Sequence, residues 1–296
     1  SATTWYRLAV TCGVTVYSNA VQVVTNTPDY ATLPYRESFE NTWINGCDNQ
    51  DVPNNFWRNN PATGNTSWRR NDDGASANWG SIGNGAYSPT ASSGSFSARW
   101  HTWMAASGTS GTFDLHVNCA TAEPNKRMTF DYINTSGSDS LEIFLSTDAG
   151  ASFTKLAGFR TTSTWAERVV DFVATSATTV IRFKATSDFG VTDIGIDNVA
   201  VFELISCNGS PDAGKAVSSA DNVCPNSSFS LSITDAPIYQ GVTYQWQSSP
   251  DNVTWNDING ANNSTFTTSQ TANTWYRVVI TCTGSGLSNN STPVLV

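Results

Sequence analysis

Hydrophobic and polar residues alternate along several stretches in the middle of the chain. Four of them, KRMTFDYIN (126–134), DSLEIFLSTD (139–148), AERVVDFVA (166–174) and TTVIRFKATSD (178–188), place an apolar side chain at nearly every second position. Because successive side chains of a β-strand point to opposite faces, this period of two predicts half-buried strands. No stretch shows a helical period. Residues 33–204 are therefore expected to form an all-β domain of about ten strands, a two-sheet jelly roll.

Residues 207–296 contain shorter alternating stretches, separated by turn residues such as Asn259-Gly260. The clearest are FSLSI (229–233), TYQWQSS (243–249) and TWYRVVITC (274–282). Short strands at this spacing predict a β-sandwich.

Cys224, Trp246 and Cys282 follow one another in the order found in immunoglobulin (Ig) domains, where a disulfide joins two sheets beside a buried Trp. Tyr276 lies six residues before Cys282 rather than two, which departs from antibody-type domains. We therefore expect an Ig-like β-sandwich with a Cys224–Cys282 disulfide that stabilises it by about 3–4 kcal/mol.

The segment TWYRLAVTC at residues 4–12 returns almost unchanged as TWYRVVITC at residues 274–282. Ser18-Asn19 and Ser288-Asn289 keep the same offset of 270 residues, so the match covers two predicted strands. Residues 1–26 are therefore expected to be the C-terminal strands of a preceding Ig-like repeat. We interpret the chain as a cut through an array whose neighbouring repeats contact one another.

Composition narrows the class of protein. Charged residues make up 13% of the chain, and the formal net charge is −9. The sequence has no basic stripe that would neutralise phosphates, which argues against nucleic-acid binding. It also has no apolar run of roughly 18 residues, so no membrane span is predicted.

Six scattered cysteines without a CxxC pair indicate disulfides in an oxidising compartment rather than a zinc site. We expect a Cys47–Cys119 bridge to hold the long polar segment of the jelly roll. The pairing of Cys12 and Cys207 stays open, because Cys207 either joins the Ig-like domain or remains a thiol.

Short motifs carry a resemblance to known families: ESFEN, SWRRNDDG, LEIFLSTDAGASFTKL and DIGIDNVAVFE in residues 33–204, and TYQWQSSPDNVTWNDINGANNSTF in residues 207–296. Residues 33–204 resemble the MAM-type jelly roll and the cleaved-adhesin domain of secreted Bacteroidota proteins. Residues 207–296 resemble Ig-like repeats of large surface proteins from the same phylum. The resemblance implies an extracellular or cell-surface adhesin-like protein, exported by the type 9 secretion route.

Calcium is the one cofactor that the sequence suggests. The first and last strands of such a jelly roll lie side by side, and carboxylates at strand ends supply the oxygens that Ca²⁺ requires. The related adhesin domains bind structural calcium in this way, by resemblance. Alternatively, these carboxylates are solvated or bind backbone amides. The candidate ligands are Glu40 and Asp197 first, and then Glu37, Asp72 and Asp73.

The segment from residue 45 to 103 is rich in Trp. An exposed Trp stacks on sugar rings, so Trp79 and Trp103, which have polar neighbours, are candidate ligand-binding residues. The alternative is that these large rings fill the core under long loops, which is the commoner role of Trp.

STDAGASF (146–153) matches an Asp-box turn, for which we expect a structural role. In it Asp148 binds the amides of the turn, Gly150 takes a positive φ, and Phe153 packs underneath. Glu142 is a candidate to face a groove, but no second acid alternates with it on its strand, and no nucleophile motif is present. The chain is therefore not expected to be an enzyme.

The sequence thus favours a non-catalytic segment of a repetitive exported adhesin. In this interpretation Ig-like spacers carry a jelly roll that binds carbohydrate or a surface protein. The alternatives are a purely structural stalk or extracellular fibre subunit, and an accessory module of a secreted enzyme.

Overall fold

The computed structural model describes residues 2–25, 27–64, 66–71, 87–102, 105–135, 139–189 and 193–296. These residues form strands, turns and loops and contain no helix, so the all-β fold class is confirmed. It follows that the described residues include no helix that could cross a membrane. The chain divides into two compact units, Ser1–Phe202 and Glu203–Val296.

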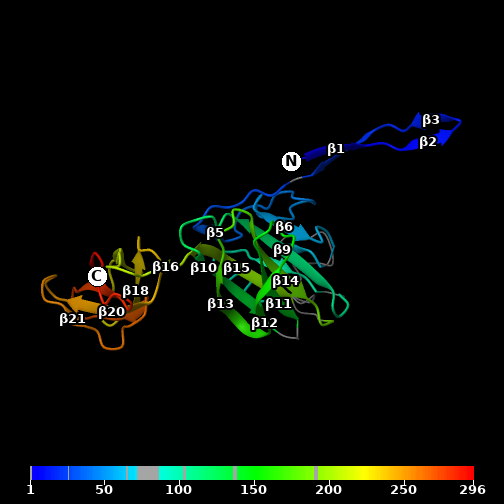
Figure 1. The fold of residues 1–296 in the computed structure, drawn as a ribbon. Coiled ribbons are helices and arrows are strands. Elements are labelled where there is room, and N and C mark those ends of the chain that lie inside the picture. The colour runs from blue at the N-terminus through cyan, green and yellow to red at the C-terminus, as the bar shows by residue number, and fades with distance from the viewer. Residues whose placement is uncertain are drawn as a thin grey trace. The chain divides into compact units, whose positions relative to one another are not determined.

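Two antiparallel sheets make up the body of the first unit (Figure 1). The strands of the six-stranded sheet are, in spatial order, β13 (Thr162–Val173), β10 (Asn125–Asn134), β15 (Ile194–Glu203), β8 (Ala98–Trp100) and β7 (Trp68–Arg70), with β5 (Tyr35–Glu37) paired to β15. Those of the five-stranded sheet are β12 (Thr154–Phe159), β11 (Ser140–Ser146), β14 (Thr179–Thr186), β9 (Ser110–Val117) and β6 (Trp57–Asn60). The four strands predicted from alternation are present as β10, β11, β13 and β14.

An aromatic cluster centred on Phe113 of β9 joins the two sheets. The Phe113 ring stacks on Trp57 of β6, with 4.3 Å between ring centroids, and on Trp68 of β7, with 5.6 Å. Trp43 and Phe39 lie 5.6 and 6.4 Å away on the same measure. All five side chains are at most 3% exposed. Because β7 belongs to the six-stranded sheet and β9 to the other, these rings connect the two halves of the sandwich.

The first and last strands of the sandwich lie side by side, as the sequence predicts. Val199 of β15 is paired with Glu37 of β5 in antiparallel register. This pairing brings the segment that follows β5 next to the residues around Asp197.

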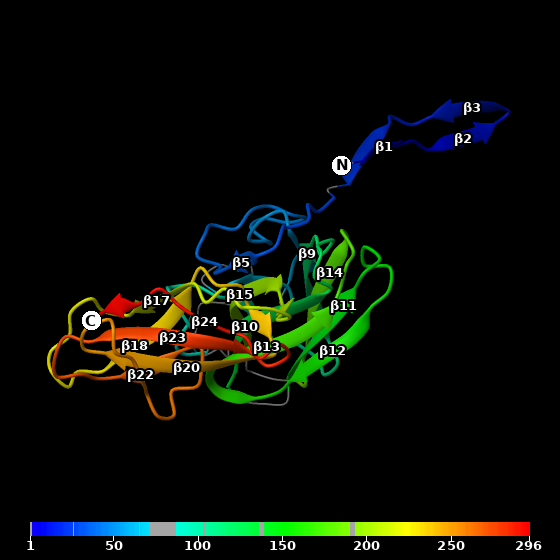
Figure 2. The same ribbon diagram turned by 60° about the vertical axis from the view of Figure 1, so that its left-hand side comes forward.

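The second unit is a smaller sandwich (Figure 2). One sheet contains β17 (Lys215–Ser218), β18 (Phe229–Thr234) and β22 (Phe266–Thr268). The other contains β21 (Asn256–Asp257), β20 (Val242–Ser249), β23 (Trp275–Cys282) and β24 (Ser288–Asn290), with β25 (Val294–Leu295) paired to β23. Trp246 is fully buried in its core, together with Leu231 and Val278.

The disulfide of the second unit joins Cys207 to Cys282, so the expected Cys224–Cys282 pairing is wrong. Strand β16 (Ile205–Ser206) pairs with β19 (Tyr239–Gln240), and Val242 at the start of β20 lies opposite Cys282. This register brings the Cα atoms of Cys207 and Cys282 to 5.5 Å, a normal disulfide separation. Cys224 lies in an exposed turn and remains a thiol.

The expected Cys47–Cys119 bridge is also wrong. Cys47 is exposed in a surface turn, whereas Cys119 is fully buried just after β9. The two thiols therefore occupy different environments, and the polar segment is held by hydrogen bonds instead.

Residues 2–25 form a hairpin in which β1 (Ala2–Tyr6) pairs with β4 (Val21–Thr25), and β2 (Ala9–Cys12) with β3 (Val14–Tyr17). One face of it, the apolar hairpin face, consists of Tyr6, Val10, Val16 and Val21, which are 56–67% exposed. The matching positions of β23 are buried: Tyr276 is 4% and Ile280 2% exposed. The hairpin thus repeats a sequence that forms part of the core in the second unit, but in the hairpin the corresponding apolar side chains are exposed.

The Cys207–Cys282 bond closes a loop of 75 residues. In the chain-entropy model such a bond stabilises the folded state by about 4 kcal/mol. We expect Cys207→Ser to lower the free energy of unfolding of the second unit by about this amount. The matched control Cys224→Ser should stay within ~0.5 kcal/mol, because an exposed turn residue is replaced. Urea unfolding followed by Trp fluorescence measures both, and equal losses would contradict the assigned pairing.

Candidate binding face

The solvent side of the five-stranded sheet carries a compact set of charged and aromatic side chains. Phe113, Phe183 and Ile143 point into the core, so their strand neighbours point outward. In the antiparallel register Asp114 lies opposite Arg182, and Arg182 opposite Phe144. We call this side the charged face, made up of Arg58, Thr112, Asp114, Glu142, Phe144, Lys155, Arg182 and Lys184.

Two ion pairs fix the geometry of the charged face. The Arg182 guanidinium donates to both carboxylate oxygens of Asp114, each at 2.8 Å. The Lys155 ammonium donates to Glu142 Oε1 at 2.6 Å. This hydrogen bond, together with the charge of Lys155, lowers the pKa of Glu142. Both acids of the face are therefore already paired with a cation.

A hollow of about 220 Å³ opens on the charged face, lined by Thr112, Phe144, Phe153, Arg182 and Lys184. It combines two aromatic rings with two cations, which is the mixture of apolar surface and few polar groups typical of ligand sites.

The Asp-box turn forms one wall of the hollow. Asp148 accepts hydrogen bonds from the Ser146 hydroxyl and from the backbone N–H and hydroxyl of Ser152, which lower its pKa to about 2. Gly150 has a φ of +89°, and the Phe153 ring lies beneath it. The expected structural role of the turn is confirmed. In addition, the Arg182 guanidinium lies 3.7 Å from the centroid of the Phe153 ring, a cation–π contact.

The two leading calcium candidates hold opposite ends of one loop. Asp197 Oδ2 accepts the backbone N–H of Ser92 at 3.0 Å, and Glu40 Oε1 accepts those of Ser95 and Phe96 at 2.9 Å. Burial raises the pKa of Asp197, although these hydrogen bonds favour its charged form. Both carboxylates thus accept hydrogen bonds from backbone amides, and these contacts do not test calcium binding.

Glu37 has hydrogen-bond partners of its own. It accepts hydrogen bonds from the backbone N–H of Phe39 and from the side chains of Tyr35 and Asn54, and burial raises its pKa. Asp72 and Asp73 fall outside the described residues. Within those that are described, no three His, Cys, Asp or Glu side chains gather closely enough to hold a metal ion. The calcium site therefore stays a prediction.

A second hollow, of about 380 Å³, borders β5 and β15 beside Glu37 and Asn198. Its lining residues include no aromatic ring, and the Glu37 carboxylate is already occupied by the donors above. It is therefore the weaker candidate for ligand binding.

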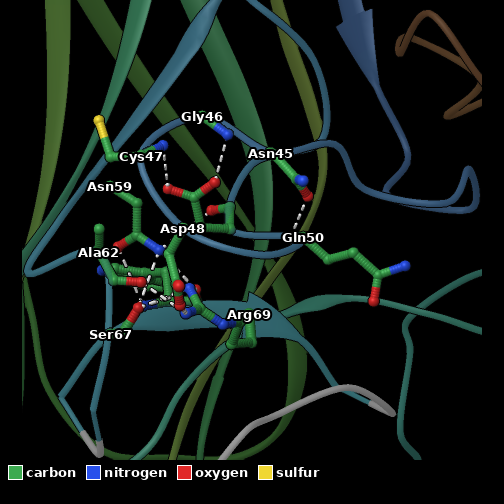
Figure 3. A network of polar contacts seen from close by, with 11 residues as sticks. Asn45, Gly46, Cys47, Asp48, Gln50, Asn59, Ala62, Ser67 and Arg69 are labelled. Carbon is green, nitrogen blue, oxygen red and sulfur yellow. Dashed lines mark hydrogen bonds and ion pairs between the residues drawn. The ribbon is translucent and has the colours of Figure 1, made fainter. Parts of the chain in front are cut away.

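The polar segment between residues 45 and 71 is held by hydrogen bonds among its own described residues (Figure 3). The Arg69 guanidinium donates to Asp48 at 2.8 Å and to the Ser67 hydroxyl at 2.7 Å. The Asn59 amide donates to the Ser67 hydroxyl and to the carbonyl of Trp68. Because Asn59, Ser67 and Arg69 are also buried, this network serves the fold rather than a ligand.

The Trp-based ligand prediction is not tested, because Trp79 and Trp103 lie outside the described residues. The described tryptophans of that region, Trp57, Trp68 and Trp100, are fully buried and belong to the core.

The residues that line the first hollow were missed because Phe144 and Arg182 stand at ordinary outward positions of strands. Only the pairing of three strands brings them together.

Buried charges elsewhere in the first unit serve the fold. Asp193 binds the Arg99 and His101 side chains and the backbone N–H of Thr102, and all four residues are at most 2% exposed. Asp139 is likewise buried and accepts the backbone N–H of Asp188 at 2.7 Å. Burial, together with a hydrogen bond to the Asp188 carboxyl, raises the pKa of Asp139 to about 7.

Comparison with known proteins gives one family match and several weak structural likenesses. Residues 213–296 match a family described as a domain of unknown function (DUF8696). No curated protein is detectably similar to the chain. A cleaved adhesin domain (K1) of Lys-gingipain from Porphyromonas gingivalis aligns at 13% identity over 57% of this chain and 97% of that one, with a TM-score of 0.40.

Two carbohydrate-binding modules give similar alignments. The xylan-binding domain CBM22-1 of Paenibacillus barcinonensis Xyn10C aligns at 11% identity over 59% of this chain and 97% of that one, with a TM-score of 0.37. TmCBM61, whose structure contains β-1,4-galactotriose, aligns at 14% identity over 50% and 88%, with a TM-score of 0.35. At these values the likeness carries no conclusion about a ligand.

The raised pKa of Asp139 predicts a pH dependence of stability. An unfolded Asp loses its proton near its ordinary pKa of 3.8, whereas the folded chain keeps it up to about pH 7. The folded state therefore binds more protons in this range, and stability falls as pH rises through it. We expect Asp139→Asn to reduce the drop in melting temperature between pH 5 and pH 8. The control Asp148→Asn should leave the drop unchanged, because Asp148 titrates near pH 2; an unchanged drop in Asp139→Asn would contradict the assignment.

Proposed function

We propose that this chain is a non-catalytic binding segment of an exported surface protein, and that the charged face of its first unit binds carbohydrate. The observation that carries this proposal is the hollow of about 220 Å³ in which Phe144 and Phe153 stand beside Arg182 and Lys184. An aromatic ring face packs against the C–H groups of a sugar ring, and charged side chains bind its hydroxyls.

The state of the two acids on the face supports a binding role rather than glycoside hydrolysis. Glycosidases need one carboxyl whose pKa is raised so that it donates a proton. Here the pKa of Glu142 is lowered by its hydrogen bond to Lys155, and Asp114 is held by the Arg182 guanidinium. Neither acid is set up as a general acid.

Export is supported by the Cys207–Cys282 disulfide, a bond typical of oxidising compartments. The type 9 route remains an inference from the family resemblance of the sequence. An open hollow of this size favours weak binding at each site. Repetition along an array would raise the apparent affinity through multivalency.

The carbohydrate proposal predicts a dependence on Phe144. We expect the full chain to bind at least one polysaccharide from a panel of galactan, xylan and polygalacturonate in isothermal titration calorimetry. Phe144→Ala should weaken that binding by about tenfold, the loss expected when apolar contact worth ~1.5 kcal/mol is removed.

Phe189→Ala is the matched control, because Phe189 is 78% exposed in the same unit and does not line the hollow. Equal losses in the two variants, or no binding to any polysaccharide of the panel, would rule out the proposal. Repeating each titration with excess chelator tests the calcium prediction on the same samples.

A second candidate function, a stalk or fibre built from repeats, is favoured by the hairpin. The apolar hairpin face repeats the sequence of β23, whose equivalent residues are buried in the second unit. Strands of the kind formed by residues 213–273, supplied by a neighbouring repeat, would cover this face as they cover β23. In this function the contacts between repeats build the stalk or fibre, and the charged face has no part in it.

The stalk candidate predicts that the uncovered face drives association in solution, because exposed apolar surface of this extent favours contacts. We expect the full chain to self-associate as its concentration rises in sedimentation equilibrium. The double variant Val10→Ser with Val16→Ser should shift this equilibrium towards the monomer. Thr11→Ser is the control, because Thr11 pairs with Thr15 on the opposite side of the hairpin. A monomeric full chain at all concentrations would count against assembly through the hairpin.

A further inference from the structure

The charged face has the opposite sign to the chain as a whole. The protein carries a formal net charge of −9, yet cations outnumber carboxylates on this face. The cations are Arg58, Lys155, Arg182 and Lys184, and the carboxylates are Asp114 and Glu142. A local excess of positive charge on an acidic protein attracts anionic ligands to that place.

Lys184 is the cation of this face whose ammonium makes no hydrogen bond to the described residues. It lies opposite Glu142 in the strand register, but the Glu142 carboxylate accepts its hydrogen bond from Lys155 instead. Among the residues that the structure describes, the Lys184 ammonium makes no hydrogen bond or ion pair. It lies 6.0 Å from the centroid of the Phe144 ring and lines the hollow. Lys184 therefore shares the charge of Glu142 with Lys155 and Arg160, and its ammonium stands beside the aromatic ring of Phe144.

Arg182 adds a second cation whose position is already fixed. The bidentate pair with Asp114 holds its guanidinium on one side, and the Phe153 ring covers it at 3.7 Å. Because the side chain is held before any ligand arrives, little conformational entropy is lost when it contacts one. The hollow therefore combines one fixed cation, one cation that makes no hydrogen bond to the described residues, and an aromatic ring.

We infer that this hollow binds an acidic sugar, a saccharide unit that carries a carboxylate or a sulfate ester. The anion pairs with the Lys184 ammonium, and the ring of the sugar packs on Phe144. The inference rests on the proposed carbohydrate-binding function and names the class of glycan that the site selects.

The shape of the hollow favours a sugar over an acidic peptide. At about 220 Å³ it is smaller than pockets for drug-sized ligands, which are roughly 300–1,000 Å³, so it admits one ring-sized unit of a longer chain. An acidic peptide would satisfy the Lys184 charge but would leave the Phe144 ring face without a matching ring. Binding of an acidic peptide is therefore the alternative that the experiment distinguishes.

The test compares four polymers on the full chain by isothermal titration calorimetry at low and moderate salt. Polygalacturonate presents carboxylates, chondroitin sulfate presents sulfates as well, galactan is neutral, and polyglutamate is an acidic peptide. We expect both acidic polysaccharides, or one of them, to bind better than galactan, with affinity falling as salt rises.

Lys184→Met removes the charge and keeps the length of the side chain. It should weaken binding of the acidic polysaccharide by about tenfold or more, the effect of losing one charge-assisted hydrogen bond. Galactan binding should be unchanged. The matched control is Lys215→Met in the second unit, where Lys215 is exposed and paired with Asp235, and it should behave as the unmodified chain.

Each other outcome is decisive. If galactan binds as well as the acidic polysaccharides and Lys184→Met changes nothing, the carbohydrate function stands and the acidic-sugar inference is overturned. If polyglutamate binds as tightly as polygalacturonate, the site is an anionic-peptide site instead. If none of the polymers binds, the carbohydrate function and this inference are both rejected. Lys184→Met should lose more affinity for one of the two acidic polysaccharides than for the other. A larger loss with polygalacturonate identifies a carboxylate as the anion, and a larger loss with chondroitin sulfate identifies a sulfate ester.

Discussion

The stack of aromatic rings around Phe113 is the contact on which the first unit depends. Phe113 belongs to the five-stranded sheet, and one of its stacking partners, Trp68, belongs to the six-stranded sheet. Truncating a buried Phe or Trp typically costs about 3–5 kcal/mol, a large share of the stability of a domain. The same stack also decides what faces solvent. With Phe113 fixed inward, strand alternation turns Thr112 and Asp114 outward, onto the charged face.

The polar residues of the first unit divide into two groups with different tasks. Asn59, Ser67 and Arg69 are buried and satisfy one another and the backbone, which allows long loops to cover a core filled with tryptophan. Asp197 and Glu40 act in the same way on the loop between Ser92 and Phe96. The charged face differs because its ion pairs are partly exposed and leave Lys184 available to a ligand. The described part of the long loops is thus structural, and a regular sheet face offers the best site.

The two units share one arrangement of side chains at an Asp-containing turn. In each, an Asp binds the amides of a turn, and an aromatic residue after the turn lies under an Arg from a neighbouring strand. The pairs are Phe153 with Arg182 and Trp255 with Arg277, at 3.7 and 4.3 Å. In the second unit the Arg277 guanidinium donates a hydrogen bond to the Gln247 side chain. In the first unit the Arg182 guanidinium donates to Asp114 instead. The same arrangement therefore forms a wall of the hollow only where further cations and Phe144 lie beside it.

The side-by-side placement of the first and last strands was expected from the topology of the jelly rolls that the sequence resembles. The strands themselves, the Asp-box turn and the repeat of β23 in the hairpin could be predicted from the sequence alone. These features depend on side-chain alternation and on contacts between residues close in the chain, which a sequence displays directly. Tertiary structure decided the disulfide and the binding face. Cys282 bonds to Cys207 because the pairing of β16 with β19 places it there, and composition and spacing contain no trace of that register. Likewise Phe144, Arg182 and Lys184 meet only because β11 pairs with β14, and the order of strands in a sheet is set by packing of the whole core.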